Sequence, residues 1–198
     1  MPGTAEDAAT HVPAPSARYE SYSHEALAAE VARDNDPVAA GQLGAQWQGL
    51  ARRFADSTAE LSALVNNTHE HWQGQAGDAV REVLGTAARW LVESAGVSTA
   101  LGESVAGQAD VAARAKAEMP PPVRYDPAGM IREAAASGSL SVLAGLSGAM
   151  DAQRARAEAA RQKAVDVMNA RDAALHGLVP QQRFESPPSL GNAAKGPA

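Results

Sequence analysis

Few side chains in this sequence have types and spacing that could support chemistry. His69, Glu70 and His71 form a short run of candidate metal ligands. Residues two apart do not share a face of a helix, so the two imidazoles point in different directions. The chain has no cysteine, and no third ligand lies nearby in sequence to complete a metal site. We therefore predict a solvated helix end here and no metal ion.

Patterns typical of catalysis are also missing. The carboxylates are scattered among Arg and Lys residues as surface charges. The sequence contains no glycine-rich phosphate loop after a strand, no Gly-x-Ser-x-Gly and no Ser/His/Asp set with an architecture to hold it. We therefore predict that the protein is not an enzyme and has neither a cofactor nor a small-molecule substrate.

Composition favours closely packed helices. Of the 198 residues, 45% are apolar but only 4% are aromatic, and much of the apolar fraction is alanine, a strong helix former. The 17 Lys+Arg and 23 Asp+Glu give a net charge of −6, which argues against nucleic acid as a partner. Residues 1–7 lack the apolar core of a cleavable signal peptide, and no stretch approaches the roughly 18 apolar residues of a membrane span.

Three regions follow from the distribution of Pro, Gly and apolar residues. Residues 1–21 are expected to form a flexible arm, residues 22–178 a helical domain and residues 179–198 a disordered tail. No strand-type alternation extends beyond a few residues, so the predicted fold class is all-α.

Helix-start signals divide the helical domain. Ser23 can cap one helix, while Asp36-Pro37 and Asp126-Pro127 combine an N-cap with proline at the first helical position. Ser137-Gly138-Ser139 is a break. The expected helices span residues 23–34, 37–70, 77–118, 126–136 and 140–175. At about 1.5 Å per residue the second and third are roughly 50 and 60 Å long, which predicts an elongated bundle built on an antiparallel hairpin.

Apolar residues with a 3.5-residue repeat follow both long helices. Such a seam predicts that the two helices pair. In the first helix it consists of Leu43, Trp47, Leu50, Phe54, Ser57, Leu61 and Leu64. In the second it consists of Val80, Val83, Ala87, Trp90, Ser94, Val97 and Leu101.

Trp72-Gln73-Gly74 occupies the joint between these helices. Glycine permits the positive φ or close backbone approach of a tight reversal. The indole either covers the open end of the hairpin as a capping aromatic or offers a surface to a partner. A second Trp-x-Gly, Trp47-Gln48-Gly49, lies inside the seam and is assigned to packing.

The ordered set of motifs resembles a known family. Trp47-Gln48-Gly49-Leu50-Ala51, Trp72-Gln73-Gly74, Trp90-Leu91 and Met119-Pro120-Pro121-Pro122-Val123 follow one another along the chain. This order is similar to that of the PPE family of actinobacterial type VII (ESX) secretion substrates, over residues 36–175. Similarity to the smaller WXG100 proteins is confined to the hairpin.

The resemblance implies pairing with another helical protein. It implies a heterodimer with a PE-like or WXG100-like helical hairpin. A secretion system with its own ATPase would export this complex, already folded, from the cytoplasm to the cell surface or the medium. The sequence lacks the family's Pro-Pro-Glu near the start. Tyr19, Tyr22 and Tyr125 are not followed four residues later by the Asp or Glu of the Tyr-x-x-x-Asp/Glu secretion motif. The partner is therefore expected to carry that motif, with Trp72 and Gly74 as the other half of a composite signal.

An apolar run opens the last helix. Leu140, Val142, Leu143 and Leu146 follow the Ser137-Gly138-Ser139 break. By resemblance, this is the tip that a cytosolic secretion chaperone binds. The alternative is an amphipathic helix start that packs on its neighbours.

Two other functions remain open. One is a secreted scaffold protein that self-assembles through its apolar seams into an oligomer. The other is a cytoplasmic coiled-coil adaptor without a role in secretion.

Overall fold

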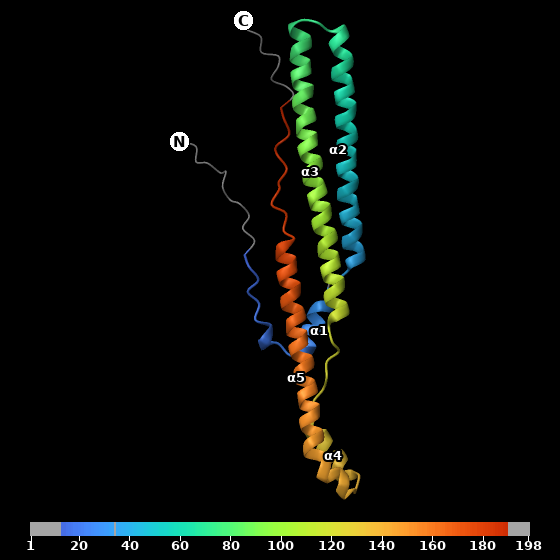
Figure 1. The fold of residues 1–198 in the computed structure, drawn as a ribbon, viewed down its shortest axis with the longest axis vertical. Helices are drawn as coiled ribbons and strands as arrows, with labels where there is room; N and C mark the ends of the chain where they lie inside the picture. The colour runs from blue at the N-terminus through green and yellow to red at the C-terminus, as the bar shows by residue number, and fades with distance from the viewer. Residues whose placement is uncertain (1–12, 34, 190–198) are drawn as a thin grey trace, which may run out of the picture. The chain divides into compact units, whose positions relative to one another are not determined.

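The computed structural model describes residues 13–33 and 35–189, and every regular element within these ranges is a helix. The elements are the short 3-10 helix η1 (Tyr19–Ser21) and the α-helices α1 (His24–Ala32), α2 (Pro37–His71), α3 (Gln75–Glu118), α4 (Pro127–Ala136) and α5 (Leu140–Gly177). Figure 1 shows their order along the chain. The predicted all-α fold is confirmed.

The helices begin where the sequence places cap residues. The side chains of Ser23 and Asp126 each accept a hydrogen bond from the backbone N–H three residues later, at 3.1 and 2.9 Å, and thereby start α1 and α4. Helix α2 begins at Pro37, as predicted. Between α4 and α5, Gly138 has φ +63°, a left-handed conformation that glycine adopts without strain.

The chain divides into two compact units, which we describe separately. The hairpin unit contains α2, α3 up to Ala109 and the described residues that follow α5. The α5 unit contains the described residues before α2, α3 from Asp110 onward, α4 and α5.

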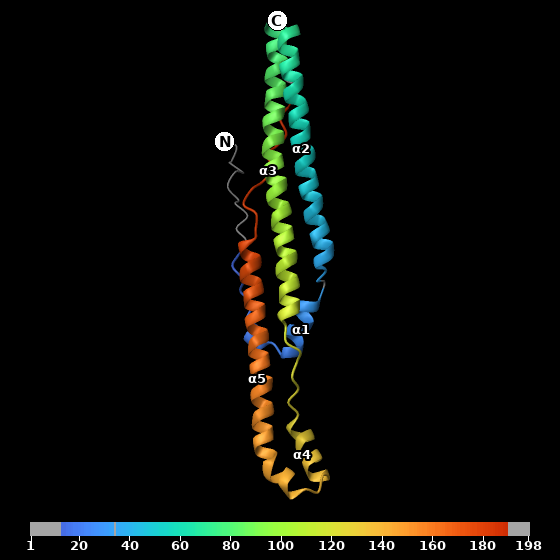
Figure 2. The ribbon, with the colours of Figure 1, turned by 45° about the vertical axis from the view of Figure 1, so that its right-hand side comes forward.

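In the hairpin unit, α2 and α3 lie side by side in both ribbon views (Figures 1 and 2). Their backbones approach closely at Gly44 and Gly102. A methyl group added to either glycine would lie 3.0 Å from the carbonyl oxygen of the other. Farther along, Phe54 of α2 packs edge-on against Trp90 of α3, with ring centroids 6.1 Å apart.

On α2, the line of residues that contacts α3 is shifted by one residue from the row of the predicted seam that contains Leu43 and Leu50. One row of that seam is half-buried beside α3: Trp47, Phe54 and Leu61. In the other row, Leu43 and Leu64 remain 46% and 48% exposed and Leu50 is half-buried, whereas Gly44 and Ala51, each one residue later, are buried. Small residues occupy the contact line because only they allow the backbones to approach this closely. The leucines therefore lie at its edge.

The core of the α5 unit lies in the second half of α5. Its buried residues are Tyr19, Leu27, Val31, Ala115, Ala164, Val165, Val167 and Met168. The apolar run at the start of α5 does not belong to this core. The predicted site residues of this helix all lie in that run, at Leu140, Val142, Leu143 and Leu146. Instead, the later part forms the contact face, through Ala164, Val165, Val167 and Met168.

Polar contacts fix the segment before α1 to α5. The Tyr19 hydroxyl donates to Asp172 Oδ2 at 2.5 Å and accepts from Arg171 Nη2 at 3.1 Å. Arg161 donates to the backbone carbonyls of Glu20 and Tyr22. The packed region therefore begins at Tyr19, inside the segment predicted to be a flexible arm. Residues 1–12 lie outside the described residues.

We predict that Gly102→Ala destabilises the hairpin. The new methyl group would lie 2.9 Å from Gln48 Cγ and 3.0 Å from the Gly44 carbonyl, and such crowding costs about 1–3 kcal/mol. The gain in helix propensity, about 1 kcal/mol, offsets only part of this. Gly96→Ala is the control on the same helix, because nothing lies within 4 Å of its added methyl. In chemical denaturation, we expect Gly102→Ala to lower the midpoint and Gly96→Ala to raise it; a rise for both would contradict close backbone packing.

A second prediction concerns Tyr19. Burial, followed by the hydrogen bond to Asp172, raises the pKa of Tyr19 from 10.0 to about 12. The folded state thus favours the protonated phenol, so this stabilisation is complete below pH 10 and is lost as pH rises toward 12. We expect Tyr19→Phe to lower the free energy of unfolding at neutral pH by about 1–3 kcal/mol. It should also flatten the decline in stability between pH 10 and 12, whereas the exposed Tyr22→Phe should keep the decline of the unmodified protein.

Candidate functional site

The turn of the hairpin lies at the Trp72-Gln73-Gly74 joint. Helix α2 ends at His71 and α3 begins at Gln75. Gly74 has φ +99°, a conformation that other residues rarely adopt. Trp72 is 56% exposed at this end of the hairpin. The side chains of His69, Glu70 and His71 lie outside the described residues, so the prediction for them stays open.

Main-chain contacts hold Trp72 in place. Its N–H donates to the Thr68 carbonyl and its own carbonyl accepts from Arg81 Nη1, both at 2.8 Å. Arg81 is in turn held by Asp78 at 2.5 Å. These hydrogen bonds use the backbone atoms of Trp72, so a substitution of its side chain leaves them in place.

Sequence reasoning missed Gly77 and Arg81, which shape this turn. Gly77 is buried directly against the Trp72 carbonyl, where a methyl group would clash with the oxygen. Arg81 reaches back across the first turn of α3 to the same oxygen. The available signal was the Asp78/Arg81 pair, because residues three apart in a first helical turn are neighbours.

The hairpin is apolar on one side of its contact line. On α2, the row of Trp47 and the row of Leu43, Leu50 and Leu64 lie on the same side of Gly44 and Ala51, as the 3.5-residue repeat requires. On the other side of that line, α2 carries exposed small and polar residues: Ala45, Gln48, Arg52, Ala55 and Ser62. The predicted seam residues Trp90 and Leu91 of α3 are half-buried. We call the side of the hairpin with Trp47 and Leu64 the apolar side.

Part of the apolar side is covered by the residues that follow α5, which we call the tail segment (residues 178–189). This segment has no helix or strand, but it makes specific contacts with the hairpin. Phe184 stacks on Trp47 with ring centroids 6.1 Å apart and an interplanar angle of 29°. Ser104 Oγ donates to the Leu178 carbonyl at 2.6 Å, and Trp90 Nε1 donates to the Glu185 carbonyl at 2.9 Å. Residues 190–198 lie outside the described residues.

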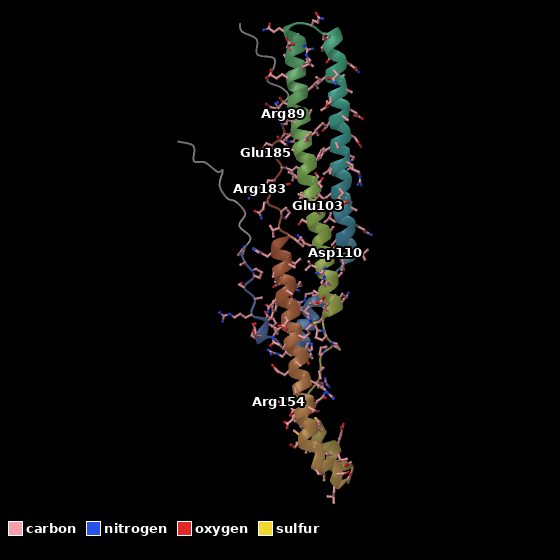
Figure 3. All side chains as sticks on the ribbon, in the orientation of Figure 1. Arg89, Glu103, Asp110, Arg154, Arg183 and Glu185 are labelled. Carbon is pink, nitrogen blue, oxygen red and sulfur yellow. The ribbon has the colours of Figure 1, made fainter. Side chains whose placement is uncertain are left out.

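The tail segment follows α3 in the ribbon views, and Figure 3 labels Arg183 and Glu185 on it beside Arg89 and Glu103 of α3. At one end, the Leu178 side chain packs over Gly107, where a methyl group would lie 3.0 Å from Leu178 Cδ2. Near the other end, residues of the segment and of α3 line an open cavity of about 680 Å³. This cavity is far larger than the roughly 10–15 Å³ that one water molecule needs, so the segment does not pack closely over its whole length.

A second exposed apolar surface lies at the α4–α5 tip of the α5 unit. Leu140 is 83% exposed, Val142 and Leu143 are also exposed, and Leu146 is half-buried. A cavity of about 410 Å³ lies between α4 and α5 and is lined in part by Val142 and Leu146. The run is therefore presented to solvent more than it is packed on its neighbours.

The described residues contain no group of three or more His, Cys, Asp or Glu side chains that could hold a metal ion. Among the helices of these residues, none is long and apolar enough to cross a membrane. The most distinctive surfaces of the described residues are the hairpin turn, the apolar side and the tip.

The sequence matches no protein-family model, and no curated protein sequence matches it.

Proposed function

We propose that this protein is a type VII secretion substrate that pairs with a PE-like or WXG100-like helical hairpin and is exported folded. The observation that carries the proposal is the exposed Trp72 beside the left-handed Gly74, at the end of a long two-helix hairpin. The motif order that resembles the PPE family supports the same function.

The apolar side of the hairpin supports a helical partner. Leu43 and Leu64 of α2 and Val80 of α3 remain exposed after α2 and α3 have paired. They lie along two helices with a 3.5-residue repeat, and a second pair of amphipathic helices would cover such a stripe by the same packing. Exposed apolar side chains in a row of this kind support an interaction site.

The geometry of the turn supports a recognition role for Trp72. The main chain of Trp72 is fixed by hydrogen bonds to Thr68 and Arg81, which holds the base of a large exposed indole at the turn and lowers the order that is lost when a partner covers it. None of the chain's tyrosines is followed by Asp or Glu at the spacing of the secretion motif. In this proposal the partner supplies that motif beside Trp72, and the secretion ATPase recognises the composite.

The tip supports a role for a cytosolic secretion chaperone. Leu140, Val142 and Leu143 would promote aggregation in the cytoplasm unless another protein covered them. We propose that a chaperone binds this tip before export and leaves the hairpin turn accessible.

Pairing can be tested by co-expression with a PE-like or WXG100-like helical hairpin protein. We expect a 1:1 complex with a higher melting temperature than the free chain. Leu64→Lys should weaken the complex at least tenfold, because it places a charge in the apolar contact. Ser62→Lys, on the polar side of the same helix, should leave the affinity unchanged.

The outcome separates pairing from its alternatives. A free chain that is monodisperse and gains nothing from the hairpin protein would show that pairing is not obligatory. Concentration-dependent self-association that Leu64→Lys abolishes would favour the self-assembling scaffold.

The signal role can be tested with Trp72→Ala. The hydrogen bonds of Trp72 come from its main chain, so we expect helicity by circular dichroism to remain near that of the unmodified protein. Export of the complex into the medium should be lost. Equal export of the variant would refute the signal role, and a loss of helicity would assign Trp72 to packing.

A further inference from the structure

We propose that the tail segment is a built-in competitor of the helical partner: it occupies part of the docking surface and must leave when the partner binds. This inference rests on the proposed function, since it names the surface on which the partner docks and a contact that regulates docking. The occupant of the surface in the free chain is residues 178–189 of the chain itself.

The tail segment lies on the apolar side of the hairpin, where the partner would dock. Phe184 stacks on Trp47, which belongs to the row of α2 next to Leu43 and Leu64. The tail segment therefore covers the apolar side, not the polar side, of α2. On α3 the tail segment contacts Trp90 and Ser104, which lie two heptads apart and therefore share one heptad position. Val83 and Val97 occupy the same heptad position. A helical partner laid along the apolar side would meet these residues.

The length of the extended tail segment matches the distance between its two hydrogen-bond donors on α3. Ser104 and Trp90 are about 21 Å apart along α3, at about 1.5 Å per residue. From Leu178 to Glu185, an extended chain at about 3.1 Å per residue covers about 22 Å. The two side-chain donors thus meet the carbonyls at both ends of a stretched segment. Because they bind backbone oxygens, they hold an extended chain without fixing its side chains.

The tail segment packs loosely against the hairpin. Phe184 remains 42% exposed although it stacks on Trp47. The open cavity beneath the segment is lined by Trp90 and Val97 on one side and by Arg183 and Pro188 on the other. Apolar surface of the hairpin thus stays partly hydrated under the segment. A closely packed helix would remove more of this surface from water, which favours the partner over the segment.

Competition between the tail segment and the partner changes the apparent affinity of the partner. The partner's apparent Kd equals its intrinsic Kd divided by the fraction of molecules whose segment is released. Weakening the segment raises that fraction and therefore tightens binding, although no residue of the docking surface has changed.

The test uses the full chain with Phe184→Ala, and Phe184→Tyr as the matched control that retains the aromatic ring. The first measurement is tryptophan fluorescence of the free chain. We expect a red shift for Phe184→Ala, which a synthetic peptide of residues 178–189 reverses, and no shift for Phe184→Tyr. If Phe184→Ala leaves the emission unchanged, or the peptide does not bind it, the segment does not occupy the surface and the proposal is overturned.

The second measurement is the Kd for the PE-like or WXG100-like helical hairpin protein used in the co-expression test. We expect an apparent Kd about tenfold lower for Phe184→Ala, an unchanged value for Phe184→Tyr, and competition by the synthetic peptide. If both variants bind as the unmodified chain does, the partner docks elsewhere: pairing stands and the competitor role fails. If no variant binds, the proposed pairing itself fails, and the competitor role fails with it.

Discussion

The close approach of α2 and α3 at Gly44 and Gly102 is the constraint on which the hairpin unit depends. Two backbones can come this near only where neither carries a side chain. The contact line is therefore narrow, and the larger apolar side chains of α2 lie along one edge of it. A two-helix hairpin cannot bury that edge by itself. The contacts of Phe184 with Trp47 and the exposure of Leu64 are two consequences of this one arrangement.

Helix boundaries were predictable because they depend on local chemistry. The cap at Ser23, the proline at Pro37 and the reversal at Gly74 each act within a few residues, so the sequence carries the signal. The register of the hairpin was harder to predict. Hydrophobic periodicity selects Leu43 over its neighbour Gly44, yet the neighbour makes the contact because backbone approach counts for more than side-chain apolarity. The rows of the predicted seam lie beside that line.

The tail and the α5 core could not be found from sequence for a different physical reason. The contacts of the tail segment use the carbonyls of Leu178 and Glu185, and every residue has a carbonyl. Its Pro-rich composition is typical of a disordered chain, and periodicity carries no information about an extended segment. In α5, Ala164 and Met168 lie among charged residues, and the hydroxyl of Tyr19 meets Asp172 from the other end of the sequence. Such long-range polar contacts have no local signature.

A surface that must stay closed in one state and open in another needs a cover of intermediate strength. Hydrogen bonds to carbonyls suit that role, because water replaces them at a net change of only about 0.5–1.5 kcal/mol each. An aromatic pair contributes a similar amount beyond its buried area. Each of these contacts contributes little and the order of the extended chain opposes them, so a segment held by a few such contacts is only weakly bound. Its attachment to the same chain keeps its effective concentration high, which lets weak contacts cover the apolar side until a better-packed helix arrives.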